Sequence, residues 1–266
     1  MLQHAGEWRL ELLPQGRGDI PGPELFWMRD FDKWYELCFQ VVLVRGNDRI
    51  ILVNTGPAED LTPMNEQWAG FLGERAALRR GEREFLIDGL ADRGVTPEQV
   101  TDIILTPLQL YTVSNVTRFP NANIWISKRG WVHFHTTHDH PHDDRDTCLP
   151  PEVLQYLVGP AWPRVRLLED EDEVAPGVRT WWAGTHHRAS VVVEVETEVG
   201  VAAISDAYFY RENVERPHPI GINESMYEAL DCYARVRRDA DVILPLYDPK
   251  NLERFPDGVV AEGKVV

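Results

Sequence analysis

Runs of apolar residues predict the β-strands of this chain. Residues 37–56, "LCFQVVLVRGNDRIILVNTG", place two β-branched runs around the turn "RGNDR", which is typical of a hairpin. Residues 190–207, "SVVVEVETEVGVAAISDA", predict a second hairpin with Glu-Val-Gly at its turn. We also expect two buried strands, a strand–turn–strand unit and a last strand, at residues 102–106, 121–127, 164–184 and 241–249.

Helical periodicity fills the intervals between these strands. Residues 64–93 are helical in period and close on Gly94, and residues 223–240 have the pattern of an amphipathic helix. Thr96, Pro97 and Glu98 carry a capping signal for a short helix. Residues 130–160 are rich in His, Asp and Pro, and we expect them to be irregular.

Strand pairs and helices therefore alternate twice along the chain. No linker rich in Gly or Ser separates the two parts, so we expect one domain over residues 1–266, made of two similar halves. Such a pattern predicts a layered α/β sandwich with sheets inside and helices outside. The first predicted hairpin ends at the small-residue turn Asn54-Thr55-Gly56-Pro57, where a strand would deliver side chains to a site.

Composition limits the classes of partner. The 266 residues hold 27 basic and 43 acidic side chains, which gives a formal net charge of −16. So acidic a surface argues against nucleic acid or anionic membrane as partners. The first residues lack the apolar region of a signal peptide, and no apolar run approaches the length of a membrane span. Three scattered cysteines without a CxxC pair are typical of reduced thiols in a cytoplasmic protein.

Five segments, in order from about residue 36 to 260, carry a family resemblance. They are "IILVNTGP", "FPNANIWISKRGW", "EVAPGVRTWWAGTHHRAS", "ISDAYFYRENVE" and "ILPLYDP". Together they resemble the metallo-β-lactamase superfamily and, within it, the N-acyl homoserine lactonase-like branch. The resemblance implies a four-layer αββα sandwich with mixed sheets inside and helices outside. It also implies hydrolysis at two metal ions, usually zinc, held by a His-x-His-x-Asp-His motif, a later His, a bridging Asp and a last His.

The ligands that this resemblance implies are mostly replaced here. The motif falls on "TPLQLYT", residues 106–112, so its first two histidines become Pro107 and Gln109, its Asp becomes Tyr111 and its final His becomes Thr112. The last His becomes Tyr247, and an early Asp becomes Asn54. His186 and Asp206 keep ligand positions. Catalytic zinc needs about three protein ligands, and neither a phenol that titrates near ~10 nor a neutral amide replaces imidazole well. The sequence therefore predicts no ordinary dinuclear site and no cofactor.

Two interpretations are open for the residues that remain. His186 facing Asp206 is either an acid–base unit or a leftover pair in a closed pocket, and His187 lies beside it. Tyr111 and Tyr247 either fill the space of the lost ions or donate hydrogen bonds to a carbonyl group of a ligand. We also expect Asn54, Gln109, His187, Trp182, Tyr208 and Phe209 to contact a substrate. Phe209 falls where lactonases often place a Tyr, so the resemblance implies a hydroxyl that is missing here.

A histidine-rich segment adds a further candidate. Residues 133–144, "HFHTTHDHPHDD", hold five of the nine histidines. They follow the strand at residues 121–127 and not the strand at 102–106, so they are not the lost motif displaced. Pro141 interrupts any helix there. We expect this segment to be a solvent-exposed loop that binds metal only nonspecifically. The alternative is a loop that lies at the mouth of the pocket.

Three functions are compatible with these observations. The first is a hydrolase-like enzyme that acts on a small carbonyl compound (lactone, ester or amide) with protein acid–base groups: His186, Asp206, Tyr111 and Tyr247. The second is a non-catalytic descendant, a pseudoenzyme that binds a small molecule or a protein. The third is a hydrolase with a single zinc, manganese or iron ion, which His187 or a histidine from residues 133–142 would complete. We expect the protein to be a monomer or a homodimer.

Overall fold

Two mixed sheets form the centre of the protein. The computed structural model describes residues 8–136 and 145–263. Within these ranges the larger sheet has seven strands: β1 (Arg9–Pro21), β2 (Trp34–Gly46), β3 (Arg49–Val53), β4 (Asp102–Leu105), β5 (Asn123–Ser127), β6 (Val165–Leu168) and β12 (Val259–Ala261). Their spatial order is β12-β1-β2-β3-β4-β5-β6. Strands β3 to β6 are parallel to one another, whereas the pairs β12–β1, β1–β2 and β2–β3 are antiparallel.

The smaller sheet uses the second half of the chain. Its five described strands are β7 (Glu171–Ala175), β8 (Val178–Trp182), β9 (Val191–Thr197), β10 (Gly200–Ser205) and β11 (Val242–Pro245). Their order is β11-β10-β9-β8-β7, with β10 and β11 parallel and the other pairs antiparallel.

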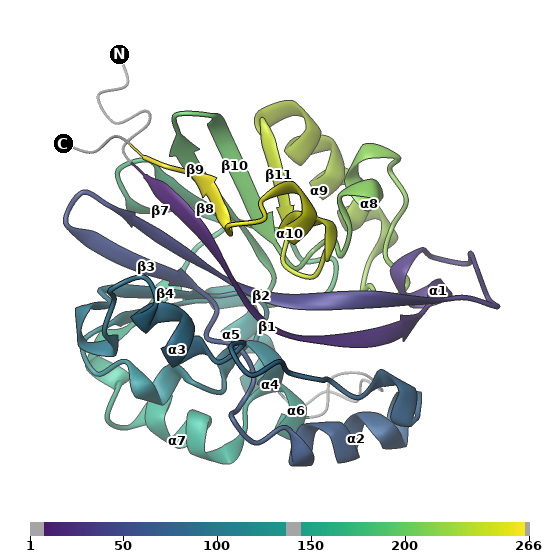
Figure 1. The fold of residues 1–266 in the computed structure, drawn as a ribbon, viewed down its shortest axis with the longest axis horizontal. Helices are drawn as coiled ribbons and strands as arrows, with labels where there is room; N and C mark the ends of the chain where they lie inside the picture. Colours follow the sequence, from purple (N-terminus) through teal and green to yellow (C-terminus); the bar gives the residue numbers. More distant parts are fainter. Residues whose placement is uncertain (1–7, 137–144, 264–266) are drawn as a thin grey trace.

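Helices cover the outer faces of the two sheets (Figure 1). The helices of the first half and the middle of the chain are α1 (Gly22–Leu25), α2 (Thr62–Leu72), α3 (Leu86–Ala91), α4 (Leu110–Val113), α5 (Lys128–His135), α6 (Arg145–Cys148) and α7 (Pro151–Val158). Those of the second half are α8 (Arg211–Glu215), α9 (Met226–Asp239) and α10 (Lys250–Arg254). Figure 1 shows α3, α5 and α7 on one side of the sheets and α8 and α9 on the other. No helix in the described ranges combines the length and apolarity needed to cross a membrane.

Three hydrophobic cores separate the layers. On β2, Val42 contributes to the core between the sheets, and the next residue, Leu43, to the core under α3 and α7. On β9, Val193 lies between the sheets, and Val192 packs with Tyr233 of α9. Strands buried on both faces explain the nearly continuous apolar runs in the sequence. The expected four-layer αββα sandwich is confirmed.

Both predicted hairpins are present. Strands β2 and β3 are joined by Asn47 and Asp48, whose φ angles of 50° and 57° suit the tight turn. Strands β9 and β10 pair from Thr197 and Gly200 inward. The capping box at Thr96 is also formed, and it opens the 3-10 turn Pro97–Gln99.

The long helix expected over residues 64–93 is wrong. Helix α2 ends at Leu72, because Gly73 takes φ 83° and ψ 167°, a conformation outside the helical region. After the 3-10 turn Glu74–Ala76, Arg79 is extended and bridges Arg17 of β1. Helix α3 begins only at Leu86.

Other boundaries also differ from expectation. The segment at residues 164–184 forms three strands in two sheets, because β6 joins the larger sheet before β7 and β8 form a hairpin in the smaller one. Strand β11 is not the last, since β12 returns beside β1. The supposedly irregular region contains α5, α6 and α7. Strand β1 carries no simple strand pattern, because its pairing with β2 shifts register between Pro14 and Gly16.

Candidate functional site

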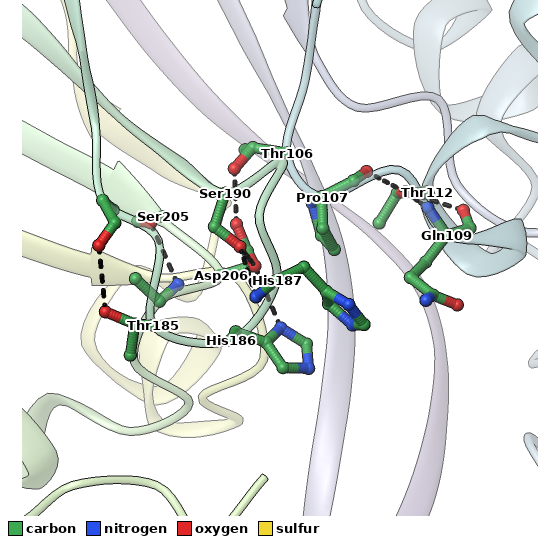
Figure 2. A network of polar contacts seen from close by, with 12 residues as sticks. Thr106, Pro107, Gln109, Thr112, Thr185, His186, His187, Ser190, Ser205 and Asp206 are labelled. Carbon is green, nitrogen blue, oxygen red and sulfur yellow. Dashed lines mark hydrogen bonds and ion pairs between the residues drawn. The ribbon is translucent and has the colours of Figure 1, made fainter. Parts of the chain in front are cut away.

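The candidate site lies where strands of both sheets end. Thr106 follows β4 directly, and Asp206 follows β10. Tyr247 follows β11, which is parallel to β10. Because the carboxyl ends of parallel strands meet at one edge, these side chains from distant parts of the sequence come together. Figure 2 shows Thr106, Ser190 and His186 around Asp206.

Asp206 is fully buried and surrounded by donors. The Thr106 hydroxyl hydrogen-bonds its Oδ1 atom, and the Ser190 hydroxyl hydrogen-bonds Oδ2. His186 Nδ1 lies 2.9 Å from the same Oδ2. Buried carboxylates need such partners, since an unpaired one would lose its hydration without compensation. The two hydroxyl donors therefore hold Asp206 as an acceptor, and its contact with Nδ1 fixes the ring of His186.

His186 belongs to a short, tightly held loop between β8 and β9. Thr185 has φ 67°, and its hydroxyl donates to Ala183 O over 3.1 Å. Farther along the loop, Arg188 forms ion pairs with Glu224 and with Glu228 of α9. These contacts orient the loop so that the His186 ring points toward Asp206 with Nδ1, while Nε2 points away from it (Figure 2).

A cavity of about 250 Å³ opens beside His186. Its described lining is mostly apolar and aromatic: Gly18, Asp19, Ile20, Glu24, Leu37, Phe39, Gln67, Trp68, Phe71, Leu72, Ala76, Gln109, Tyr111, Thr147, His186, His187, Phe209, Ile222 and Tyr247. An apolar pocket with a few converging polar groups is the usual form of a small-molecule site. Six of the ten site residues expected from the sequence line it: Gln109, Tyr111, His186, His187, Phe209 and Tyr247.

Aromatic rings form the wall between His186 and the rest of the cavity. The Phe209 ring centre lies 4.8 Å from that of His186 and 5.1 Å from that of Tyr247. Tyr111 lies 6.1 Å from Tyr247 and 5.7 Å from Trp68 of α2. The contacts are edge to face, the arrangement that the ring quadrupoles favour.

The Tyr247 hydroxyl has no hydrogen-bond partner in the described part of the chain, although the side chain is only 2% exposed. Burial, followed by the neighbouring Tyr111 and the charge of Asp206, raises the pKa of Tyr247 well above its usual range. Burial and Asp206 raise the pKa of Tyr111 in the same way. Both phenols therefore keep their protons at neutral pH and can donate.

Glu24 is a cavity residue that the sequence did not predict. It lies in α1, and its Oε2 atom is buried without a hydrogen-bond partner among the described residues. Burial raises the pKa of Glu24 from 4.5 to about 7.

The donor groups near Asp206 do not fit a dinuclear zinc centre. Thr112 Oγ1 lies 2.7 Å from the carbonyl oxygens of Pro107 and Gln109, and Gln109 Nε2 lies 3.5 Å from Cys148 Sγ. The phenols of Tyr111 and Tyr247 are protonated and are poor zinc ligands. In the described ranges no three His, Cys, Asp or Glu side chains stand together as a metal site would require. This donor set suits hydrogen bonding and proton transfer.

The other expected site residues lie outside the cavity lining. Both amide atoms of Asn54 bind the backbone of Thr106, at 2.7 and 2.8 Å, so this side chain clamps the end of β4. The Tyr208 hydroxyl donates to Ala203 O over 3.0 Å within the core under α9. The guanidinium carbons of Arg129 and Arg188 lie 4.1 and 5.0 Å from the ring centre of Trp182, which does not line the cavity.

The histidine-rich segment is described only in part. His133 and His135 belong to α5, where the His135 ring packs 4.5 Å from that of Trp131. Residues 137–144, with three of its five histidines, lie outside the described residues. The interpretation of this segment stays a prediction.

Sequence reasoning also missed the two hydroxyl donors to Asp206. Thr106 and Ser190 lie 84 residues apart and flank buried strands, positions at which small hydroxyl residues are common. The proximity of β4 and β9 at this edge, rather than any motif, makes them part of the site.

Comparisons with known proteins rest on the fold. No family model and no curated protein matches the sequence. Among solved structures, an N-acyl homoserine lactone hydrolase with the product N-hexanoyl-L-homoserine at its catalytic metal centre matches with a TM-score of 0.77. That likeness has 20% identity and covers 94% of this chain and 96% of the other.

Two further structures agree with it. A probable metal-dependent hydrolase from Staphylococcus aureus matches with a TM-score of 0.72 at 14% identity, over 92% of this chain and 90% of its own. A dizinc quorum-quenching lactonase matches with a TM-score of 0.66 at 16% identity, over 96% and 90%. The protein therefore has the metallo-β-lactamase fold, in the form also found in N-acyl homoserine lactone hydrolases.

Proposed function

We propose that the protein binds a small carbonyl compound (a lactone, ester or amide) in this cavity and hydrolyses it with protein acid–base groups, without a dinuclear metal centre. One observation carries the proposal. His186 lines the cavity, and the buried carboxylate of Asp206 holds its Nδ1 atom at 2.9 Å. A histidine oriented in this way by a carboxylate is a suitable general base.

The hydrogen bond with Asp206 determines which ring nitrogen of His186 carries the proton. Asp206 accepts hydrogen bonds from Thr106 and Ser190, so the His186 nitrogen that faces it carries the hydrogen. The neutral ring then has its lone pair on Nε2, on the side away from Asp206 (Figure 2). From there Nε2 can take a proton from a water molecule that attacks the carbonyl carbon, and Asp206 stabilises the imidazolium that forms. When the acyl C–O or C–N bond of the tetrahedral intermediate breaks, the imidazolium returns this proton to the leaving oxygen or nitrogen.

Tyr111 and Tyr247 supply the complementary donors. Attack on a carbonyl group places negative charge on its oxygen, which donors held in advance stabilise. Both phenols line the cavity beside His186, and their raised pKa keeps them protonated. The buried Tyr247 hydroxyl interacts with the phenol of Tyr111, and the two phenols together would bind that oxygen.

The structural neighbours narrow the class of substrate to be tested first. Two of them were solved with the ring-opened product of an N-acyl homoserine lactone. Phe209 brings no hydroxyl to the cavity of this chain, so a lactone would rely on Tyr111 and Tyr247 instead. Lactones, aryl esters and simple amides are therefore compared in one panel.

The test is turnover by His186→Ala on that panel, with metal removed from protein and buffer. We expect wild-type turnover to persist without metal and kcat/KM to fall by about 10²–10⁴ in the variant. His218→Ala is the matched control, because His218 contacts Trp27 O and does not line the cavity. Turnover equal in wild type and His186→Ala would refute the proposed base. Binding without any product would assign a non-catalytic binding protein, and turnover only with added metal would assign a metal hydrolase.

A further inference from the structure

Glu24 brings an uncompensated carboxyl group to the wall of the cavity. It lies in α1, just after β1, and its backbone oxygen accepts a hydrogen bond from Gly221 N over 2.8 Å. This contact is tight, since a Cβ atom at Gly221 would meet Pro23 O at 1.7 Å. The backbone of Glu24 is therefore fixed, and Glu24 is one of the residues that line the same cavity as His186.

No described group neutralises this carboxyl. Its Oε2 atom is buried without a hydrogen-bond partner, and burial raises the pKa of Glu24 to about 7 with no basic side chain to oppose the shift. The other acid of the lining, Asp19, differs because it pairs with Arg75 and Arg79. Neither Lys nor Arg is among the described lining residues.

The remainder of the cavity offers apolar contacts. Side chains of Ile20, Leu37, Phe39, Trp68 and Leu72 form its wall. A ligand that fills this space must have an apolar body, and a carboxylate or phosphate group on it would meet Glu24 without a compensating cation. A buried acceptor in an apolar pocket instead selects a ligand that supplies the missing donor.

We propose that Glu24 binds an amino group or another cationic nitrogen donor of an otherwise apolar ligand, and so sets the specificity of the cavity. This inference rests on the proposed function only in taking this cavity as the ligand site. The paired charges would replace the lost hydration of both groups, and a charge-assisted hydrogen bond adds directional selectivity. The substrate class becomes an apolar carbonyl compound that also carries an amine.

The test compares three probes that share one apolar chain: hexylamine, hexanol and hexanoate. Binding is followed by calorimetry and by the fluorescence of tryptophan, since Trp68 lines the cavity. We expect wild-type protein at pH 8 to bind hexylamine at least about ten-fold more tightly than hexanol, and hexanoate least. Glu24→Gln should bring the affinities for hexylamine and hexanol to within about two-fold.

Glu74→Gln is the matched control. It removes the same charge from an exposed side chain, two residues before the lining residue Ala76, and should keep the preference for the amine. Equal binding of amine and alcohol by wild type, a preference that survives Glu24→Gln, or no binding of any probe would each overturn the inference. These outcomes are independent of His186, because an amine preference can be present without turnover and turnover can be present without an amine preference.

Discussion

Two buried tyrosines near Asp206 differ in one respect that can be measured. The Tyr208 hydroxyl donates to Ala203 O, whereas the Tyr247 hydroxyl has no hydrogen-bond partner in the described residues. Removing a satisfied hydrogen bond costs about 1 kcal/mol, but removing an unsatisfied buried hydroxyl costs little. The hydroxyl of Tyr247 is thus a group that stability does not require.

Tyr208→Phe should lower the free energy of unfolding by about 1 kcal/mol, while Tyr247→Phe leaves it unchanged or raises it slightly. Denaturant unfolding of both variants measures this difference. In the proposed reaction Tyr247→Phe should also lower kcat by about 10²-fold, since it removes a donor to the developing oxyanion. An equal loss of stability in both variants would mean that the Tyr247 hydroxyl is bonded in solution.

Glu24 makes stability depend on pH in a direction that can be worked out. Its pKa is about 7 in the folded protein and 4.5 in the ordinary state, so between these values the folded protein binds more protons than the unfolded chain. Stability therefore falls as pH rises from about 4.5 to 7. The side chain is partly exposed, which reduces the effect.

Glu24→Gln should therefore be more stable than wild type at pH 8, by about 1–3 kcal/mol, and nearly equal to it at pH 4.5. Denaturant unfolding at the two pH values gives the difference directly, with Glu74→Gln as the variant that changes charge alone. A constant difference between Glu24→Gln and wild type across this range would show that Glu24 titrates normally.

Among the helices and strands, those with a strong sequence pattern could be predicted, whereas an end set by the backbone conformation of a single residue could not. The apolar run that begins at residues 191–193 and the Glu-Val-Gly turn at residues 198–200 identified β9, because a strand buried on both faces has a nearly continuous apolar run. The periodicity of residues 64–93 missed the end of α2, since a glycine in a helical pattern is compatible both with the interior of a helix and with its end. Gly70 and Gly73 illustrate the two cases.

Gly70→Ala should raise the free energy of unfolding by about 0.5–1 kcal/mol, because a methyl group there meets no atom within 4 Å and favours the helix. Gly73→Ala should lower it by about 1–2 kcal/mol, because φ 83° strains any side chain although the space is equally open. Thermal unfolding of the two single variants compares them. If α2 ends at Gly73, the two substitutions must change the free energy of unfolding in opposite directions.

At the scale of the molecule, the layers could be predicted from the sequence and the full site could not. Two alternations of strands and helices, together with the family resemblance, were sufficient for the sandwich and for the pairing of His186 with Asp206. Thr106, Ser190 and Glu24 have no local signal, because their roles depend on which strand ends and helices meet at one cavity. The role of Asn54 also depends on a spatial neighbour, since its partner Thr106 follows the adjacent strand β4.

The net charge of the whole molecule favours the same class of ligand as Glu24 does in the cavity. With a net charge of −16, the surface attracts cations and repels anions over distances of about a Debye length, ~8 Å at physiological salt. Glu24 would continue this selection inside the cavity. Amine-bearing ligands are therefore favoured both on approach and in the site.

The metal content of each chain decides whether the proposed chemistry depends on protein groups or on a metal centre. Tag-free protein is grown with zinc, manganese and iron, dialysed against a weak chelator, and analysed beside Asp206→Ala. We expect far less than one ion per chain in both proteins, and wild-type turnover that the chelator does not change. One or two tightly held ions per wild-type chain, lost in Asp206→Ala, would contradict it and assign the chemistry to a metal centre.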